Sequence, residues 1–187
     1  LSEFLNVDKD RLRQALNELA FQAHSMQAEL AGTADIDESK LVSALLGLSR
    51  EKHLNPIDLL DYLSQRAGLL LPRGVGVYTF PHRTFQEYLA ACYLTDHDYP
   101  DQLCRLVRDD FERWREVTRL AGAKATRGMG GASWSLAEAL CESEPGQATN
   151  LTDMWMAYLA GQVLSEIAHL NQVSRRDQPK LARIKRW

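Results

Sequence analysis

Apolar residues recur three and four positions apart over most of the chain, which is the periodicity of amphipathic helices. The first such stretch runs over residues 9–30, and its apolar positions share one helical face. They are Leu12, Leu16, Leu19, Ala23, Met26 and Leu30. Asp8 is a candidate N-cap for this helix, and Gly32 and Thr33 are expected to follow its end.

Two more helices are predicted before residue 68. The second begins near Asp37. Its apolar stripe comprises Ile36, Leu41, Leu45 and Leu48. The third begins at Asn55 and Pro56, since Asn caps helices and Pro fits the first helical position. It is expected to end at Gly68, because glycine commonly follows the last turn of a helix.

Residues 69–80 follow a different pattern, with short apolar and β-branched runs on either side of Arg73 and Gly74. This pattern predicts a small β-hairpin that turns at these two residues. Three helices followed by a hairpin is the order of elements in a winged-helix domain. We therefore predict a winged-helix domain over residues 1–81.

The remaining residues, 82–187, are predicted to form a helical domain. Thr84 is a candidate N-cap for its first helix, because Glu87 follows at capping-box spacing. Later helices are predicted over residues 99–109, 111–122, 133–142, 151–171 and 176–187. Loops are predicted at the glycine-rich residues 122–133 and at residues 142–150. The expected fold is mainly α, an antiparallel helical domain after the winged helix, with the start of a helical repeat array as one interpretation.

Composition indicates a globular chain. Of its 187 residues 45% are hydrophobic and 25% charged, which excludes a disordered, collagen-like or disulfide-rich protein. The sequence has no apolar run long enough to span a bilayer, no signal-peptide pattern and no CxxC pair among its three cysteines. These features predict a cytoplasmic protein without a membrane partner. The chain also begins without Met, and we interpret it as a fragment of a longer protein.

The charge distribution argues against DNA binding by the winged helix. The third predicted helix carries Asp58, Asp61 and Arg66, whereas phosphate contacts need clustered Lys and Arg. A basic cluster lies instead at residues 175–186, with six basic residues and one acidic residue. We interpret this tail as a solvated helix face. The alternative function is a free-standing winged-helix nucleic-acid-binding protein that uses the tail.

No catalytic or metal-binding residues are predicted. The glycine-rich segment 122–131 is not a P-loop, because Lys124 precedes the second glycine and no strand leads into the segment. No two of the five histidines have the spacing of a helical zinc site, and no nucleophile motif is present.

The most specific part of the sequence is residues 78–94. Its motif is Phe80-x-His82-x-x-Phe85-Gln86-Glu87-Tyr88-x-Ala90-Ala91. This motif closely resembles the one that closes the winged-helix region of NACHT-family NTPases, which belong to the STAND class of signal-transduction ATPases together with NOD-like receptors. Residues 66–70 before the hairpin and residues 114–122 after it also resemble that family.

The resemblance implies a regulatory role. In this family an NTPase core with the P-loop lies upstream, and the winged helix folds over it in the resting state. The histidine at the position of His82 contacts the β-phosphate of ADP and helps to hold the closed form. Nucleotide exchange, or a trigger sensed by C-terminal repeats, releases the lid and allows oligomerisation. ATP or ADP with Mg²⁺ is therefore expected in the full-length parent, and no cofactor in this chain alone.

The motif residues have expected roles. His82 is predicted to donate a hydrogen bond to an ADP phosphate when the core is present, and a satisfied structural histidine is the alternative. The predicted core residues are Phe80, Phe85, Tyr88, Leu89, Cys92 and Tyr93. Gln86 and Glu87 are expected to cap a helix or to bridge helices, and Trp114 is expected to be a buried anchor.

We therefore predict a lid that holds the ADP-bound state and couples C-terminal sensing to oligomerisation in a defence-like signalling NTPase. Residues 84–94 are the expected strut between lid and sensor. The expected partners are the upstream NTPase core in cis, the C-terminal sensor or repeat region and other copies of the parent, but not nucleic acid. The parent is expected to be an ATPase, whereas this chain is not expected to be an enzyme.

Overall fold

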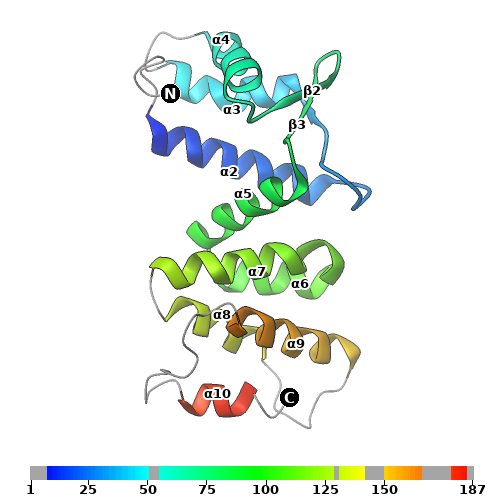
Figure 1. Ribbon diagram of the computed structural model, residues 1–187, viewed down its shortest axis with the longest axis vertical. Coiled ribbons are helices and arrows are strands. Elements are labelled where there is room, and N and C mark those ends of the chain that lie inside the picture. The colour runs from blue at the N-terminus through cyan, green and yellow to red at the C-terminus, as the bar shows by residue number, and fades with distance from the viewer. Residues whose placement is uncertain (1–7, 51–54, 129–130, 142–149, 166–177, 185–187) are drawn as a thin grey trace. The chain divides into compact units, whose positions relative to one another are not determined.

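The computed structural model describes residues 8–50, 55–128, 131–141, 150–165 and 178–184. It divides into two compact units, Leu1–Tyr93 and Leu94–Trp187. The division falls inside helix α5 (Arg83–Asp96), which begins just after the predicted boundary at residue 81. Each unit is described here by itself (Figure 1).

The first unit contains the three predicted helices. They are α2 (Lys9–Met26), α3 (Glu38–Arg50) and α4 (Pro56–Asp61), which continues as the π-helical turn η1 (Tyr62–Arg66). The N-caps predicted at Asp8 and Asn55 are confirmed. Asp8 Oδ1 accepts from the N–H groups of Asp10 at 2.8 Å and Arg11 at 3.1 Å, and Asn55 Oδ1 accepts from that of Ile57 at 3.0 Å. The helix α2 ends earlier than expected, at Met26 rather than near residue 30.

A small antiparallel sheet completes this unit. Its strands are β1 (Ile36–Asp37), β2 (Leu71–Gly74) and β3 (Val77–Thr79), in the order β1-β3-β2. Ile36 pairs with Tyr78 and Leu71 pairs with Thr79. The predicted hairpin is therefore confirmed, but β1 was missed because two residues are too short to show a period.

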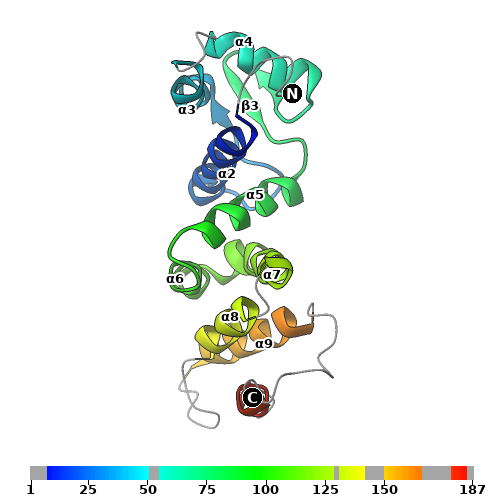
Figure 2. The ribbon, with the colours of Figure 1, turned by 90° about the vertical axis from the view of Figure 1, so that its left-hand side faces the viewer.

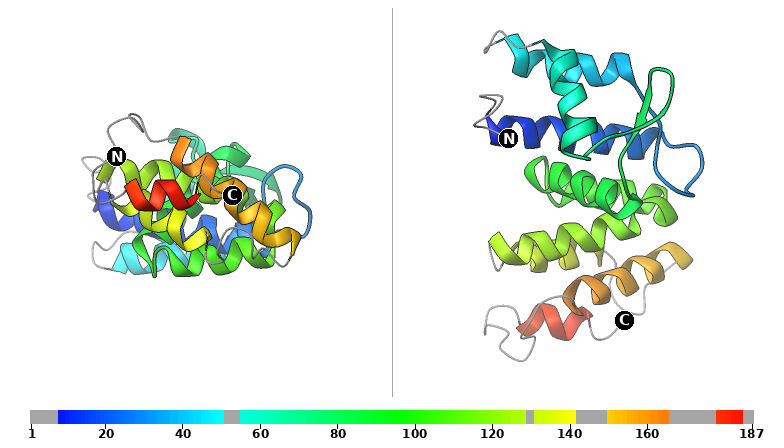
Figure 3. Two further views of the ribbon diagram at one scale, coloured as in Figure 1. Left: turned by 90° about the horizontal axis from the view of Figure 1, so that it is seen from below. Right: turned by 45° about the horizontal axis from the view of Figure 1, so that its top comes forward.

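The turn of the hairpin lies later than predicted. Arg73 and Gly74 are part of β2, and the chain reverses at Val75 and Gly76. Gly76 has a φ of +69°, a left-handed conformation that glycine adopts without steric cost. Figure 3 shows the hairpin on the same side of the helices as the loop that joins α2 to β1, and Arg73 Nη1 donates to Asp35 Oδ1 of that loop at 3.0 Å.

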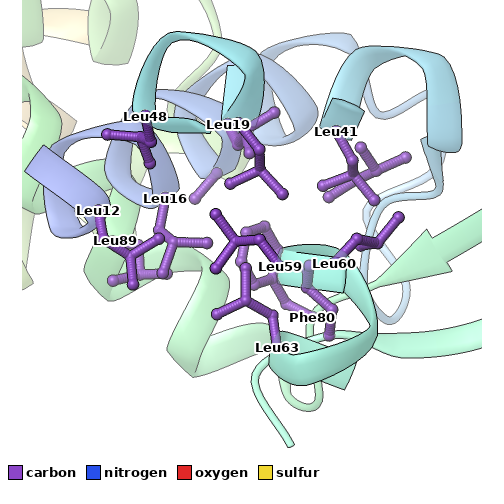
Figure 4. Close-up of a cluster of buried hydrophobic side chains, with 14 residues drawn as sticks. Leu12, Leu16, Leu19, Leu41, Leu48, Leu59, Leu60, Leu63, Phe80 and Leu89 are labelled. Atoms are coloured by element: carbon purple, nitrogen blue, oxygen red, sulfur yellow. The ribbon is translucent and has the colours of Figure 1, made fainter. Parts of the chain in front are cut away.

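A leucine-rich core holds these elements together (Figure 4). Leucines of α2, α3 and α4 meet in this cluster, and Phe80, which follows β3, and Leu89 of α5 join them. Each such side chain contributes about 1.5–3 kcal/mol when fully buried. Because Leu89 belongs to this cluster, the first half of α5 is part of the packing of the winged helix.

The start of α5 differs from the prediction. The helix begins at Arg83, two residues before a Thr84 cap would place it, and the carbonyl of His82 accepts from the N–H groups of Phe85 and Gln86. Thr84 is an exposed residue of the first turn, and Glu87 pairs with Arg83. The predicted capping box is therefore wrong, because the chain enters the helix directly from the hairpin.

The second unit is helical. Its helices are α6 (Asp101–Asp109), α7 (Phe111–Gly128), α8 (Ala132–Leu140), α9 (Leu151–Ser165) and α10 (Gln178–Ile184). Helices α8 and α9 lie side by side, and α7 packs on both (Figure 2). The loop predicted to begin at Gly122 is wrong up to Gly128, since α7 continues through these residues.

Gly122 lies where α7 packs against α9. A Cβ at this position would lie 2.7 Å from Cγ1 of Val163 in α9, so glycine lets the two helices approach closely. Ser133 Oγ donates to the carbonyl of Gly122 at 3.0 Å, which fixes α8 on the same spot. Lys124 Nζ, two residues further along α7, binds Thr95 Oγ1 and Asp96 Oδ1 at the end of α5.

In the part of the chain that the structure describes, no helix has the length and apolar character needed to cross a membrane.

Candidate functional site: the hairpin–helix junction

His82 lies where β3 gives way to α5. Two residues before it, Phe80 is buried in the leucine-rich core with 1% of its surface exposed. The carbonyl of His82 accepts two hydrogen bonds of 3.1 Å, from the N–H groups of Phe85 and Gln86, and these hold the backbone at the helix start. The side chain, by contrast, is exposed, and among the described residues it has no hydrogen-bond partner. The junction therefore presents a free imidazole on a firmly held backbone.

This arrangement suits an anion chemically. The first N–H groups of a helix have no partner within it and carry the positive end of the helix dipole. In α5 the N–H groups of Phe85 and Gln86 are taken by His82, which leaves those of Arg83 and Thr84 at the front. A ring N–H of His82 could donate to the same oxygen.

Arg83 was not singled out from the sequence, although it follows the histidine directly. Its Nε donates to Glu87 Oε1 at 2.7 Å, across one turn of the helix. The carboxylate is nearly buried, with 5% of its side chain exposed, so it neutralises most of the charge that Arg83 would bring to an anion. The i,i+4 spacing of Arg83 and Glu87 is the signal that would have identified the pair.

Gln86 joins α5 to α2 and to the loop that follows α2. The side chain is fully buried, and Nε2 lies 3.2 Å from Nδ1 of His24 and 3.2 Å from Oε1 of Gln27. Oε1 accepts from the N–H of Ala34 at 2.9 Å. Both amide hydrogens of Gln86 are used in these two contacts, so Nδ1 of His24 is the acceptor. His24 is also buried, and its ring proton is therefore assigned to its own Nε2.

Aromatic contacts support the same helix. Phe80 and Phe85 meet edge to face with centroids 6.0 Å apart, and Tyr93 stacks on Phe21 of α2 at 4.6 Å. Tyr88 departs from its predicted place in the core, since 43% of its surface is exposed. Its position on the outer side of α5 follows from the burial of the neighbouring Glu87 and Leu89.

Trp114 and the basic cluster are the other predicted features. Trp114 is a buried residue of α7 with 3% of its surface exposed, and it belongs to the second unit. Among the described residues there is no group of three or more His, Cys, Asp and Glu side chains that could hold a metal ion. The side chains of the basic cluster at residues 175–186 lie outside the described part of the chain.

The element order, the three-stranded sheet and the motif at the junction agree with a comparison against protein families. Residues 5–94 match the model of the winged helix-turn-helix domain C-terminal to NACHT. This part of the chain is a NACHT-associated winged-helix domain. Domains of this family are distinct from the NACHT module that precedes them. Separate searches of curated proteins and of solved structures gave no match.

The face of the winged-helix domain that reads DNA in other winged helices is acidic here. Its third helix, α4, exposes Asp58 and Asp61. Burial raises the pKa of the Tyr78 phenol in β3, and the carboxylates of Glu38 and Asp61 raise it further. Phosphate contacts need clustered Lys and Arg, and the exposed carboxylates of Asp58 and Asp61 oppose them.

Proposed function

We propose that the chain is a regulatory part of a NACHT-type signalling NTPase, in which the winged helix acts as a lid that holds the ADP-bound closed state. The family match of residues 5–94 supports the regulatory setting. The NTPase core is the proposed partner in cis, and it would supply the P-loop, Mg²⁺ and most of the phosphate contacts. The release of the lid would then allow copies of the parent protein to assemble.

The observation that carries the proposal is the exposed imidazole of His82 on a fixed backbone. The histidine would donate to a phosphate of ADP together with the first N–H groups of α5. Because Glu87 neutralises Arg83, the junction would contribute one or two hydrogen bonds rather than a complete anion site. The lid would thus sense the nucleotide without being able to hold it alone.

We propose that α5 is the strut that couples this contact to the C-terminal sensor region. Gln86 and Leu89 tie the first half of α5 to the winged helix, and Lys124 ties its last residues to α7. A continuous helix held at both halves is stiff, so a displacement of the first half of α5 would also displace its last residues.

The test uses a longer protein that includes the NTPase core. His82→Ala should release ADP at least several-fold faster and raise spontaneous assembly, measured by the nucleotide content of the purified protein and by mass photometry. His97→Ala, which changes another exposed histidine, is the matched control and should leave both unchanged. Unchanged ADP retention in His82→Ala would remove the proposal.

The alternative function is nucleic-acid binding by the basic tail, whose basic side chains lie outside the described part of the chain. It predicts a salt-dependent gel shift that disappears when residues 175–187 are deleted. Binding that survives the deletion would contradict this alternative as well.

A further inference from the structure

Helix α9 is apolar on both of its faces. One face is buried in the second unit and comprises Met156, Ala157, Leu159, Ala160, Val163 and Leu164. The opposite face carries Leu151, Met154, Trp155 and Tyr158, whose exposed fractions are 65%, 59%, 46% and 57%. We call these four residues the α9 stripe. A helix that is apolar all round is normally covered on all sides, so the α9 stripe is suited to a contact.

The α9 stripe is continuous and carries no charge. The ring of Trp155 lies 5.5 Å from that of Phe111 in α7 and 6.0 Å from that of Tyr158. Asp153 is the one charged residue of α9, and it is nearly buried and paired with Arg108 at 3.0 Å. The stripe therefore has aromatic and Met side chains, which are enriched in protein interfaces, and no charge that would attract a charged partner.

The size of the α9 stripe fits the centre of a dimer interface. Large side chains bury on the order of 150–250 Å² each, so four that are about half exposed leave roughly 400 Å² accessible. Patches of this size on soluble proteins are often functional. A stable dimer buries about 800 Å² per partner, of which this stripe would supply about half and its polar rim the rest.

We propose that the α9 stripe binds the same stripe of a second copy of this chain, with the two helices antiparallel. The stripe is symmetric about the point between Met154 and Trp155. Antiparallel pairing therefore places Leu151 opposite Tyr158 of the second copy, and Met154 opposite Trp155. Each pair joins a flexible aliphatic or thioether side chain to an aromatic ring, a favourable contact. A two-fold axis through this point makes the interface self-complementary. The dipoles of the two antiparallel helices then point in opposite directions, which is favourable.

Sedimentation velocity of the 187-residue chain tests this proposal. Wild type should pass from monomer to dimer between about 1 and 100 µM, and Met154→Glu should weaken the dimer at least tenfold. Val75→Glu, at the exposed tip of the hairpin, is the control and should leave the dimer unchanged. Circular dichroism confirms that both variants are folded. A wild-type monomer at about 100 µM, or a dimer equally stable in Met154→Glu, overturns the proposal.

Cross-linking tests the antiparallel register. A mixture of Leu151→Cys and Tyr158→Cys chains should form a disulfide-linked dimer much faster than either variant alone, and the three native cysteines are buried. Equal cross-linking in each single-variant sample would show a parallel pair and overturn the register. Neither experiment depends on the nucleotide contact of His82, so the two proposals can fail separately.

Discussion

The side-chain amide of Gln86 in α5 lies 3.2 Å from Nδ1 of His24 in α2, and both side chains are fully buried. These two residues are 62 positions apart in sequence, and their contact links α5 to α2. The amide also binds Gln27 and Ala34, so all of its strong hydrogen-bonding groups are used in one place. Gln86 thus gives the Gln of the motif a structural role, that of holding α5 on the winged helix.

Gln86→Leu should lower the free energy of unfolding of the first unit by about 2–4 kcal/mol. The substitution removes three hydrogen bonds and leaves His24 and the N–H of Ala34 buried without this partner. Hydrogen exchange of the Ala34 amide should accelerate in parallel. Gln22→Leu, at an exposed site of α2, should change the stability by no more than about 0.5 kcal/mol. Equal stability of Gln86→Leu and wild type would contradict this role.

Gly122→Ala should destabilise the second unit by about 1–3 kcal/mol, because its Cβ would lie 2.7 Å from Val163. All four tryptophans of the chain belong to the second unit, so tryptophan fluorescence during thermal unfolding reports on it selectively. Gly161→Ala is the matched control, since its Cβ would meet open space and it should gain up to about 1 kcal/mol. Gly122→Ala should cost less in a Val163→Ala background than in wild type, and an equal cost in both backgrounds would mean that the close contact is not the cause.

The second unit should lose stability in alkaline solution through Tyr99. Burial raises the pKa of this phenol above its ordinary value of 10.0, and the nearby Cys104 adds to the effect. Because the unfolded chain releases the phenolic proton at lower pH, this contribution to stability is present below about pH 10 and is lost as the pH rises further. Tyr99→Phe should reduce that loss while costing about 1 kcal/mol at neutral pH, since the hydroxyl donates to the carbonyl of Ala132 at 3.1 Å. If the stability of wild type and Tyr99→Phe fell identically with rising pH, the phenol of Tyr99 would not be the cause of the alkaline loss.

The 187-residue chain alone should not bind ADP measurably. It lacks a P-loop motif, and the junction at His82 supplies only a ring donor and the first N–H groups of one helix. Isothermal titration calorimetry with ADP and Mg²⁺ is the direct measurement. A micromolar dissociation constant would show that the phosphate contacts of the lid are far more complete than we propose.

The parts of the fold that the sequence predicted are those with a long period or a local signal. Leu12, Leu16 and Leu19 lie on one face over several turns, and Asp8 and Asn55 cap their helices by contacts within three residues. Family resemblance identified His82 and Gln86, but not what Gln86 touches. No local pattern joins it to His24 or Ala34, because a contact between distant segments arises only when the whole domain has packed.

Two predictions, the N-cap at Thr84 and the loop beginning at Gly122, are wrong because of tertiary packing. Thr84 and Glu87 have capping-box spacing, yet the tertiary path from β3 starts α5 at Arg83 and gives Glu87 another partner. Gly122 reads as the start of a loop, but its missing side chain serves a close contact between α7 and α9. In both cases packing overrides a local preference of about 1 kcal/mol.

The two-residue strand β1 also bears on the order of folding during synthesis. Its partner is the later strand β3, and the adjoining Ala34 bonds to a residue 52 positions further along the chain. The first helices therefore cannot reach their final arrangement until the ribosome has released α5. Such high contact order delays folding, and it makes the winged helix and the first turns of α5 a single cooperative folding unit. A truncation after the hairpin would retain every strand of the sheet and still leave that unit incomplete.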